Sequence, residues 1–97
     1  MAHRNGFKSN TGFQQAELAV DFGAIAANST LTTQLTVYGA KAGHIYLIAI
    51  DDDDLAAGIM VQGTAWCETD GQVPVRLINT TAAPVDPAAV MVHILGL

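Results

Sequence analysis

The sequence is poor in charged residues, and in basic residues above all. Only 13% of its 97 residues are charged, against about 25% in ordinary soluble domains, while 51% are hydrophobic. Lys and Arg number 4 and the formal net charge is −5, so no basic stripe can neutralise phosphates and direct nucleic-acid binding is disfavoured. With so few charges, we expect small polar residues to cover part of the surface and another subunit to cover the rest.

Cysteine and long hydrophobic runs are scarce as well. The single cysteine, Cys67, cannot form an internal disulfide, and it fits a protein that assembles in a reducing cytoplasm. The longest apolar runs, such as residues 45–50, are far too short to span a membrane. Residues 1–13 have no apolar segment behind their positive charges, so we expect no secretory signal and no membrane partner.

Alternation of apolar and polar residues is the main pattern of the chain. It is clear at 16–22 and at 29–38, where a Thr-rich face is typical of antiparallel sheets with one solvated side. Six segments bounded by turn residues are expected to be strands: 16–22, 29–38, 44–50, 59–67, 72–79 and 88–96. No segment shows a convincing helical face. We therefore predict an all-β fold, a single antiparallel β-sandwich over 16–97 with a polar N-terminal arm over 1–15.

Two of these strands carry more specific expectations. Residues 44–50 are apolar on both faces, which indicates a strand that is central in a sandwich or covered by another subunit. Pro74 lacks the N–H that a central strand donates, so 72–79 is expected to be an edge strand or to bulge at Pro74. The Asn-Thr-Thr of residues 79–81 is expected to end that strand through hydrogen bonds to its own backbone.

The acidic run Asp51, Asp52, Asp53 and Asp54 is a weak candidate for a metal site. Carboxylates on a loop can bind Ca²⁺, which takes about six to eight oxygen ligands. Consecutive aspartates in an extended segment point in opposite directions, however, and the spacing of a calcium-binding loop is missing. The alternative is a solvated turn that prevents edge-to-edge aggregation after a very apolar strand, and we therefore predict no metal.

Catalytic chemistry is not indicated. His44, His93 and Cys67 match no zinc-binding spacing, and Cys67 is expected to be a small buried hydrophobe. The sequence offers no convergent set of nucleophile, base and orienting residue. We predict that the protein is not an enzyme and uses no cofactor.

Arg76 is the only cation inside the predicted sheet. One interpretation is a surface strand residue whose stem covers neighbouring apolar area. The sharper one is a structural ion pair with Asp21 or Asp86, both of which border predicted strands.

Trp66, Met60 and Tyr46 could form an aromatic and thioether patch. We expect such residues to lie in the core of a domain whose aromatic content is only 6%. Any of them that is exposed would be the best interface anchor on the molecule.

Several short motifs follow one another in a recognisable order. They are Asp21–Ser29, Thr36–Ala40, Leu55–Gly58, Val73–Asn79 and Asp86–Ala88. In order and spacing they resemble a family of small β-sheet domains in tailed-bacteriophage structural proteins, of the head decoration (cement) type. The resemblance covers about four fifths of the chain, from Leu18 on. Two departures are His44, where an Asp usually follows the Gly, and the acidic run, which replaces a Pro-rich uncharged loop.

This resemblance implies a function in the virion. Proteins similar to this chain are jelly-roll-like β-sandwiches that usually form homotrimers and clamp neighbouring subunits of the major capsid protein, often through an N-terminal arm. The implied protein is a capsid decoration protein on the exterior of the head, assembled in the host cytoplasm, that stabilises the shell without catalysis. Contacts to the capsid or to other subunits are expected from the arm and from the doubly apolar strand, at Arg4, Phe7, Lys8, Phe13, Tyr46 and Ile48.

A second function class remains open at this point. Domains of the same kind also occur in phage tails and fibres, where they bind a receptor on the host surface. That alternative predicts a small exposed aromatic or acidic site.

Overall fold

The computed structural model describes the backbone of residues 4–9, 14–51 and 54–96, with side chains described from residue 15 on. These residues form eight strands and no helix: β1 (Arg4–Ser9), β2 (Gln14–Asp21), β3 (Ser29–Thr36), β4 (Ile45–Ile50), β5 (Ile59–Val61), β6 (Thr64–Trp66), β7 (Gln72–Asn79) and β8 (Ala89–Gly96). In the described part of the chain, therefore, no helix is long and apolar enough to cross a membrane.

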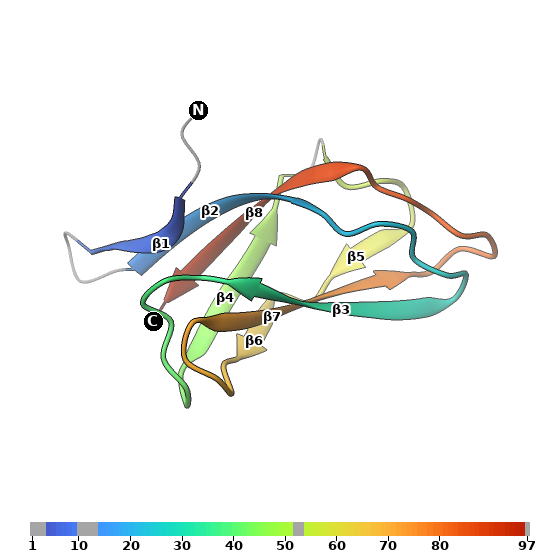
Figure 1. Ribbon diagram of the computed structural model, residues 1–97. Helices are drawn as coiled ribbons and strands as arrows, with labels where there is room; N and C mark the ends of the chain where they lie inside the picture. The colour runs from blue at the N-terminus through green and yellow to red at the C-terminus, as the bar shows by residue number, and fades with distance from the viewer. Residues whose placement is uncertain (1–3, 10–13, 52–53, 97) are drawn as a thin grey trace.

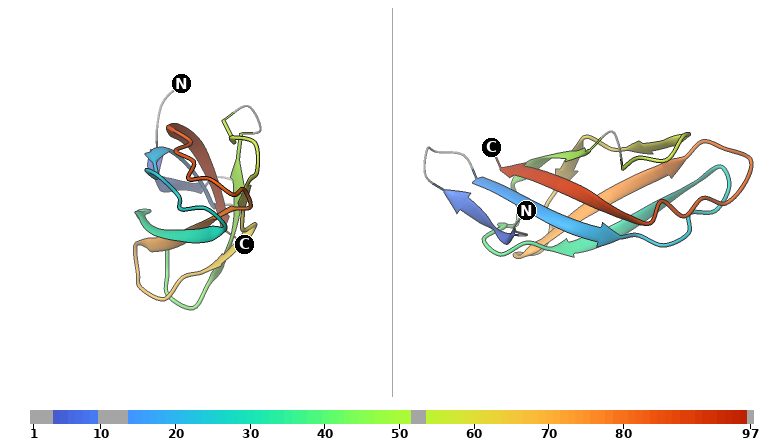
Figure 2. Two further views of the ribbon diagram at one scale, coloured as in Figure 1. Left: turned by 90° about the vertical axis from the view of Figure 1, so that its right-hand side faces the viewer. Right: turned by 90° about the horizontal axis from the view of Figure 1, so that it is seen from above.

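The strands form two antiparallel sheets that pack in a sandwich-like arrangement (Figure 1; Figure 2). The larger sheet has the order β1-β2-β8-β4-β6, and the smaller one has the order β3-β7-β5. The molecule is flat, with extents of 42 × 29 × 16 Å. The prediction of an all-β, sandwich-like fold is confirmed.

The pairing of the strands is nested along the chain. β2 pairs with β8 over its whole length, from Gln14 opposite Gly96 to Asp21 opposite Ala89. β3 pairs in the same way with β7, and the short strands β5 and β6 lie between these outer pairs in the sequence. The beginning and the end of the sandwich are therefore held together by long-range ladders.

The core lies between the sheets and follows the alternation of the sequence. The inward residues of β7 (Val73, Val75 and Leu77) are fully buried, and Val92 and Ile94 of β8 face them from the other sheet. In β3 Leu35 is buried, and Val37 just after the strand is buried too, while the Thr-rich side is exposed, as predicted. Alternation of this kind places every second side chain in the core.

The expected strand 59–67 is in fact two strands in different sheets. β5 pairs with β7, and β6 pairs with β4. The chain crosses from one sheet to the other at Gln62 and Gly63: the Gln62 N–H donates to the Arg76 carbonyl (2.9 Å), and the Gly63 carbonyl accepts from Ile48 N–H (2.9 Å). The prediction of one strand was wrong because an apolar run does not reveal that its two halves have different partners.

The N-terminal segment contains a strand that the sequence did not predict. Residues Arg4–Ser9 form β1, which pairs with β2 at the edge of the larger sheet, with a shift in register between Arg4 and Lys8. Backbone pairing at a sheet edge needs no apolar alternation, so a polar segment without a pattern of its own can form it.

β7 is the middle strand of the smaller sheet although it contains Pro74, which has no N–H to donate. β7 lies between β3 and β5, but β5 reaches only Leu77, Ile78 and Asn79. Because the Arg76 carbonyl points to the β5 side, the backbone of Pro74, two residues earlier, faces the same side beyond the end of β5. The strand is therefore central at one end and an edge on that side at Pro74, so the prediction of an edge strand was correct for only part of its length.

Asn79 ends β7 and holds two loops together, the β2–β3 loop and the β7–β8 loop. Its buried Nδ2 donates to the carbonyls of Ile25 (3.0 Å) and Ala83 (2.9 Å), and its Oδ1 accepts from the N–H and the hydroxyl of Thr81 (2.9 and 2.7 Å). The predicted strand stop is confirmed, and the amide also fixes the connection that returns the chain to β8.

Candidate functional site

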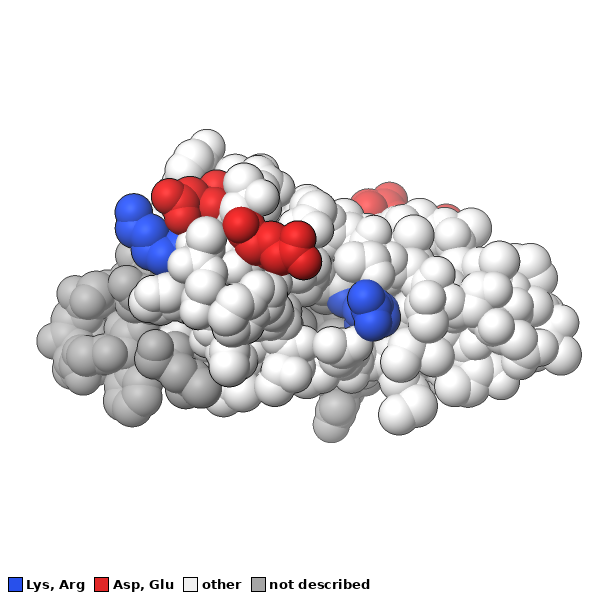
Figure 3. Space-filling view, turned by 90° about the horizontal axis from the view of Figure 1, so that it is seen from below, with Lys and Arg blue, Asp and Glu red and all other residues white. Residues whose placement is uncertain are grey.

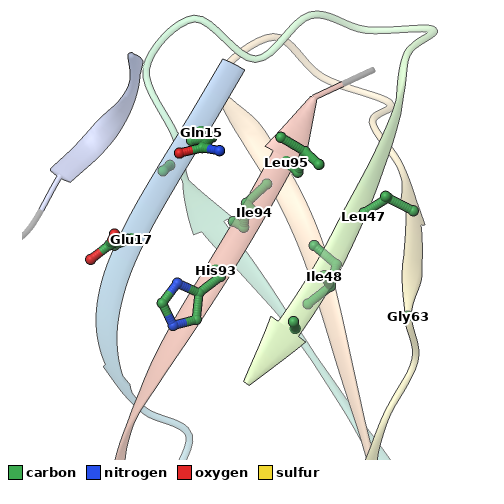
Figure 4. A pocket seen from close by; sticks show the side chains of 10 residues that line it. Gln15, Glu17, Leu47, Ile48, Gly63, His93, Ile94 and Leu95 are labelled. Carbon is green, nitrogen blue, oxygen red and sulfur yellow. The ribbon is translucent and has the colours of Figure 1, made fainter. Parts of the chain in front are cut away.

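The outer face of the larger sheet carries an apolar groove of about 500 Å³. Its side chains come from three neighbouring strands, β2, β8 and β4 (Figure 4). Those that matter here are Gln15, Glu17, Leu47, Ala49, His93 and Leu95. We call this the sheet-face groove.

Apolar side chains dominate one end of the sheet-face groove. Leu47 lies opposite Leu95 in the β4–β8 ladder, and it is 38% exposed although it is a large hydrophobe. Ile45, two residues before it on the same face, is 49% exposed. Contiguous exposed apolar area of this kind is typical of surfaces that contact another molecule.

The other end of the groove is polar. The His93 Nε2 lies 2.7 Å from Asp51 Oδ1, and His93 is directly opposite Glu17 in the β2–β8 ladder. Asp54 Oδ2 accepts a hydrogen bond from the Met91 N–H (2.8 Å). Asp51 and Asp54, the first and last aspartates of the acidic run, thus both bind to β8.

Tyr46 and Ile48, which we expected to contact other subunits, are buried in the core, with exposed fractions of 1% and 5%. The Tyr46 hydroxyl accepts a hydrogen bond from the Lys41 N–H (2.9 Å). A strand with two apolar faces buries one of them in the core. The alternation of residues along the strand does not show which face that is. The expectation was therefore wrong for these two residues, and the exposed face of β4 is that of Ile45 and Leu47.

Three of the four expected contact residues of the arm lie in β1, and the fourth lies outside the described residues. Arg4, Phe7 and Lys8 belong to β1, whose backbone alone is described, and Phe13 lies outside the described residues. β1 extends the sheet next to β2, the strand that supplies Glu17 to the groove. Their roles as contacts stay predictions.

A second groove, of about 270 Å³ and polar, lies between β6 and β7. Seven of its side chains can act as hydrogen-bond partners or as a stacking surface: Thr32, Gln34, Gln62, Thr64, Trp66, Glu68 and Arg76. We call it the β6–β7 groove. On the underside of the molecule, shown in Figure 3, charges are few and lie in isolated groups on a mostly uncharged surface.

Arg76 does not pair with either aspartate that the sequence suggested. Its Nε donates to Thr32 Oγ1 (3.0 Å) and its Nη1 to Gln62 Oε1 (3.3 Å). Asp21 and Asp86 instead accept hydrogen bonds from backbone N–H groups two residues further along their own turns. The predicted ion pair was wrong because each carboxylate has a local backbone partner, while Arg76 points to the outer face of β7.

Trp66 and Met60 are exposed, at 55% and 57%, where we expected core residues. In β6, Ala65 is buried and Trp66 therefore points outward, and the buried Cys67 follows it. The small inward residues on both sides of Trp66 were the signal that could have revealed its exposure.

The candidate metal ligands do not come together in the described part of the chain, which contains no group of three His, Cys, Asp or Glu side chains placed to hold an ion. Asp51 and Asp54 make the contacts given above, while Asp52 and Asp53 lie outside the described residues. His44 is exposed. The buried Cys67 thiol lies 3.1 Å from two backbone carbonyls, those of Thr69 and Gln72.

Comparisons with protein-family models, with curated proteins and with solved structures give no match for this chain. The two grooves and the motifs of the sequence are therefore the features from which a function can be inferred.

Proposed function

We propose that this protein is a decoration protein of a bacteriophage head, and that it docks on the major capsid protein through the outer face of its larger sheet. The observation that carries the proposal is the exposed apolar side of β4, with Ile45 and Leu47 beside the sheet-face groove. The order of the sequence motifs supplies the class of partner.

The size of the face is sufficient for stable docking. The broad side of the molecule measures 42 by 29 Å, which exceeds the roughly 800 Å² that each partner buries in an interface of standard size. Burying a side chain such as Leu or Ile gives about 1.5–3 kcal/mol. Ile45 and Leu47 are therefore suitable apolar contacts, and the polar His93 lies beside them on β8, the central strand of the sheet.

The same proposal includes the jelly-roll-like path of the chain and its assembly as a homotrimer. The nested ladders of β2 with β8 and of β3 with β7 support a jelly-roll-like path, in which a long folded-back chain rolls into two sheets. A domain of 97 residues buries a modest fraction of its surface alone, which favours association with further copies.

The mechanism requires no chemistry. A protein that binds the assembled lattice but not free capsid subunits stabilises the lattice by its binding free energy. Bridging two adjacent capsid subunits adds this energy to the contacts that already hold the shell. The N-terminal segment, which extends the docking sheet as β1, would reach toward a neighbouring subunit from the sheet edge.

The copy number of the protein in purified virions tests this proposal. We expect an abundance of the same order as that of the major capsid protein, measured by quantitative mass spectrometry of intact particles. A handful of copies per particle would instead place the protein at the tail or at a single vertex, and the decoration function would be wrong.

A further inference from the structure

The β6–β7 groove exists because the chain changes sheets. β6 runs beside β7, but β6 pairs with β4 instead, so no ladder joins β6 to β7. Pro74 faces this gap and has no N–H that the missing ladder would leave unsatisfied. The opening therefore leaves no N–H of Pro74 without a strand partner.

Hydrogen bonds hold a row of polar side chains along this groove. Gln62 donates from Nε2 to the Thr64 carbonyl (3.1 Å), and its Oε1 accepts from Arg76. Arg76 in turn donates to Thr32. The row is ordered before any ligand arrives, which lowers the entropy cost of binding.

Trp66 lies at the edge of the row and is more than half exposed. Its neighbours Ala65 and Cys67 are buried and anchor the backbone on both sides, so the exposed indole is held on a fixed strand. An indole presents a large apolar surface and a single N–H donor. Such a group next to a row of amides and a guanidinium suits a ligand with an apolar face and polar edges.

The charges of the groove select against anions. Arg76 contributes one positive charge and Glu68 one negative charge, so the lining is neutral overall. A phosphate or a nucleic acid would require an excess of cations. The amides of Gln34 and Gln62 offer both donors and acceptors, which match hydroxyl groups because a hydroxyl also donates and accepts.

From this geometry we propose that the β6–β7 groove binds a neutral saccharide, with one sugar ring on Trp66 and its hydroxyl groups on Gln34, Gln62 and Arg76. The volume of about 270 Å³ is near the lower end of ligand sites, about 300 Å³, so the groove takes a single ring and leaves the rest of a chain in solvent.

This activity goes beyond capsid docking and does not depend on it. Thr32, Gln34 and Arg76 line the groove from the outer side of the smaller sheet, whereas Trp66 lies on the outer face of the larger sheet, directly opposite Ile45 in the β4–β6 ladder. The saccharide site therefore borders the proposed docking face. Binding of a saccharide to the free protein does not require that face to be occupied.

The single tryptophan of the chain makes the test direct, because all tryptophan fluorescence arises from the groove. The purified full chain is first applied to an array of immobilised neutral and anionic glycans. Retained neutral glycans are then titrated in solution, and Trp66 emission is followed to concentrations well above about 1 mM, the dissociation constant equivalent to about −4 kcal/mol. We expect at least one neutral saccharide to shift the emission in a saturable way.

Variants connect the signal to the groove. Gln34→Ala and Arg76→Ala should each weaken binding about tenfold, which corresponds to about 1.4 kcal/mol. Trp66→Ala should abolish retention on the array. Tyr38→Ala, which removes an exposed aromatic side chain outside the groove, should bind like the parent chain. The proposal is overturned by the absence of any retained glycan, by retention of anionic glycans alone, or by binding that Gln34→Ala and Arg76→Ala leave unchanged.

Discussion

Asn79 provides the sharpest test of how this fold is held together. Its side chain makes four hydrogen bonds within a buried site, to Ile25, to Ala83 and twice to Thr81. A hydrogen bond contributes about 1 kcal/mol net, and a buried group left without a partner costs about 1–3 kcal/mol more. In Asn79→Ala the carbonyls keep one donor each, from Val85 N–H and from the Thr81 hydroxyl, so the additional penalty falls on the Thr81 N–H.

We therefore expect Asn79→Ala to lower the free energy of unfolding by about 3–5 kcal/mol. For a domain of this length the midpoint of thermal unfolding should fall by at least about 12 °C. Asn79→Asp should be at least as damaging at neutral pH, because a carboxylate cannot donate to the two carbonyls that the amide binds. Urea denaturation followed by far-ultraviolet circular dichroism measures both variants.

Thr80→Ala is the matched control in the same turn. Its exposed hydroxyl makes one hydrogen bond, to the Gly58 carbonyl (2.8 Å), so its loss should cost no more than about 1 kcal/mol. A destabilisation of Asn79→Ala by less than about 1 kcal/mol, or equal to that of Thr80→Ala, would refute the inference that the amide organises these loops.

Three further perturbations test other parts of the structure. Gly58 has φ +82° and a Cβ there would collide with Thr81 Cγ2, so Gly58→Ala should destabilise the fold by about 1–3 kcal/mol in thermal melts. Unchanged stability of this variant would contradict the backbone conformation at Gly58. Cys67 is fully buried, so a thiol reagent should label it only as fast as the protein unfolds, whereas rapid labelling in native buffer would disprove the burial. The Asp51–His93 pair is about half exposed, so Asp51→Asn should change stability by less than about 1 kcal/mol in urea denaturation, and a larger loss would show that the acidic loop supports the sheet.

The sequence predicts the long strands of this fold well, and for a physical reason. The strand predicted at 72–79 has the observed bounds of β7, and the alternation of 16–22 and 29–38 places the correct side chains in the core. Each of these strands pairs along its whole length with one long strand, β2 with β8 and β3 with β7, so one buried face is enough to define it. Asn79 as the stop of β7 follows equally from local chemistry.

The features that the sequence did not predict depend on partners far away in the chain. The run 59–67 divides at Gly63 because β5 and β6 pair with different sheets. In β4 the opposing sheet covers the face of Tyr46 and Ile48, and it leaves the face of Ile45 and Leu47 exposed. Because both faces are apolar, the sequence of the strand does not reveal which one is covered.

The candidate sites also depend on contacts between residues that are far apart in the sequence. Arg76 was expected to find a carboxylate, but local turn hydrogen bonds already use those of Asp21 and Asp86. The β6–β7 groove brings together Thr32, Trp66 and Arg76 from three separate strands, and no motif in the sequence connects them.

The central claim is that the exposed apolar side of β4 docks on a capsid lattice, and the direct test is binding to phage heads that lack this protein. Leu47→Glu places a charge on the docking face, and Met60→Glu places one on a side chain of the other sheet that is more exposed than Leu47. Cosedimentation of each variant with such heads should show loss of binding for Leu47→Glu and parent-like binding for Met60→Glu, with both variants folded by circular dichroism. Equal binding by the two variants, or loss of binding only in Met60→Glu, would contradict the proposed docking face.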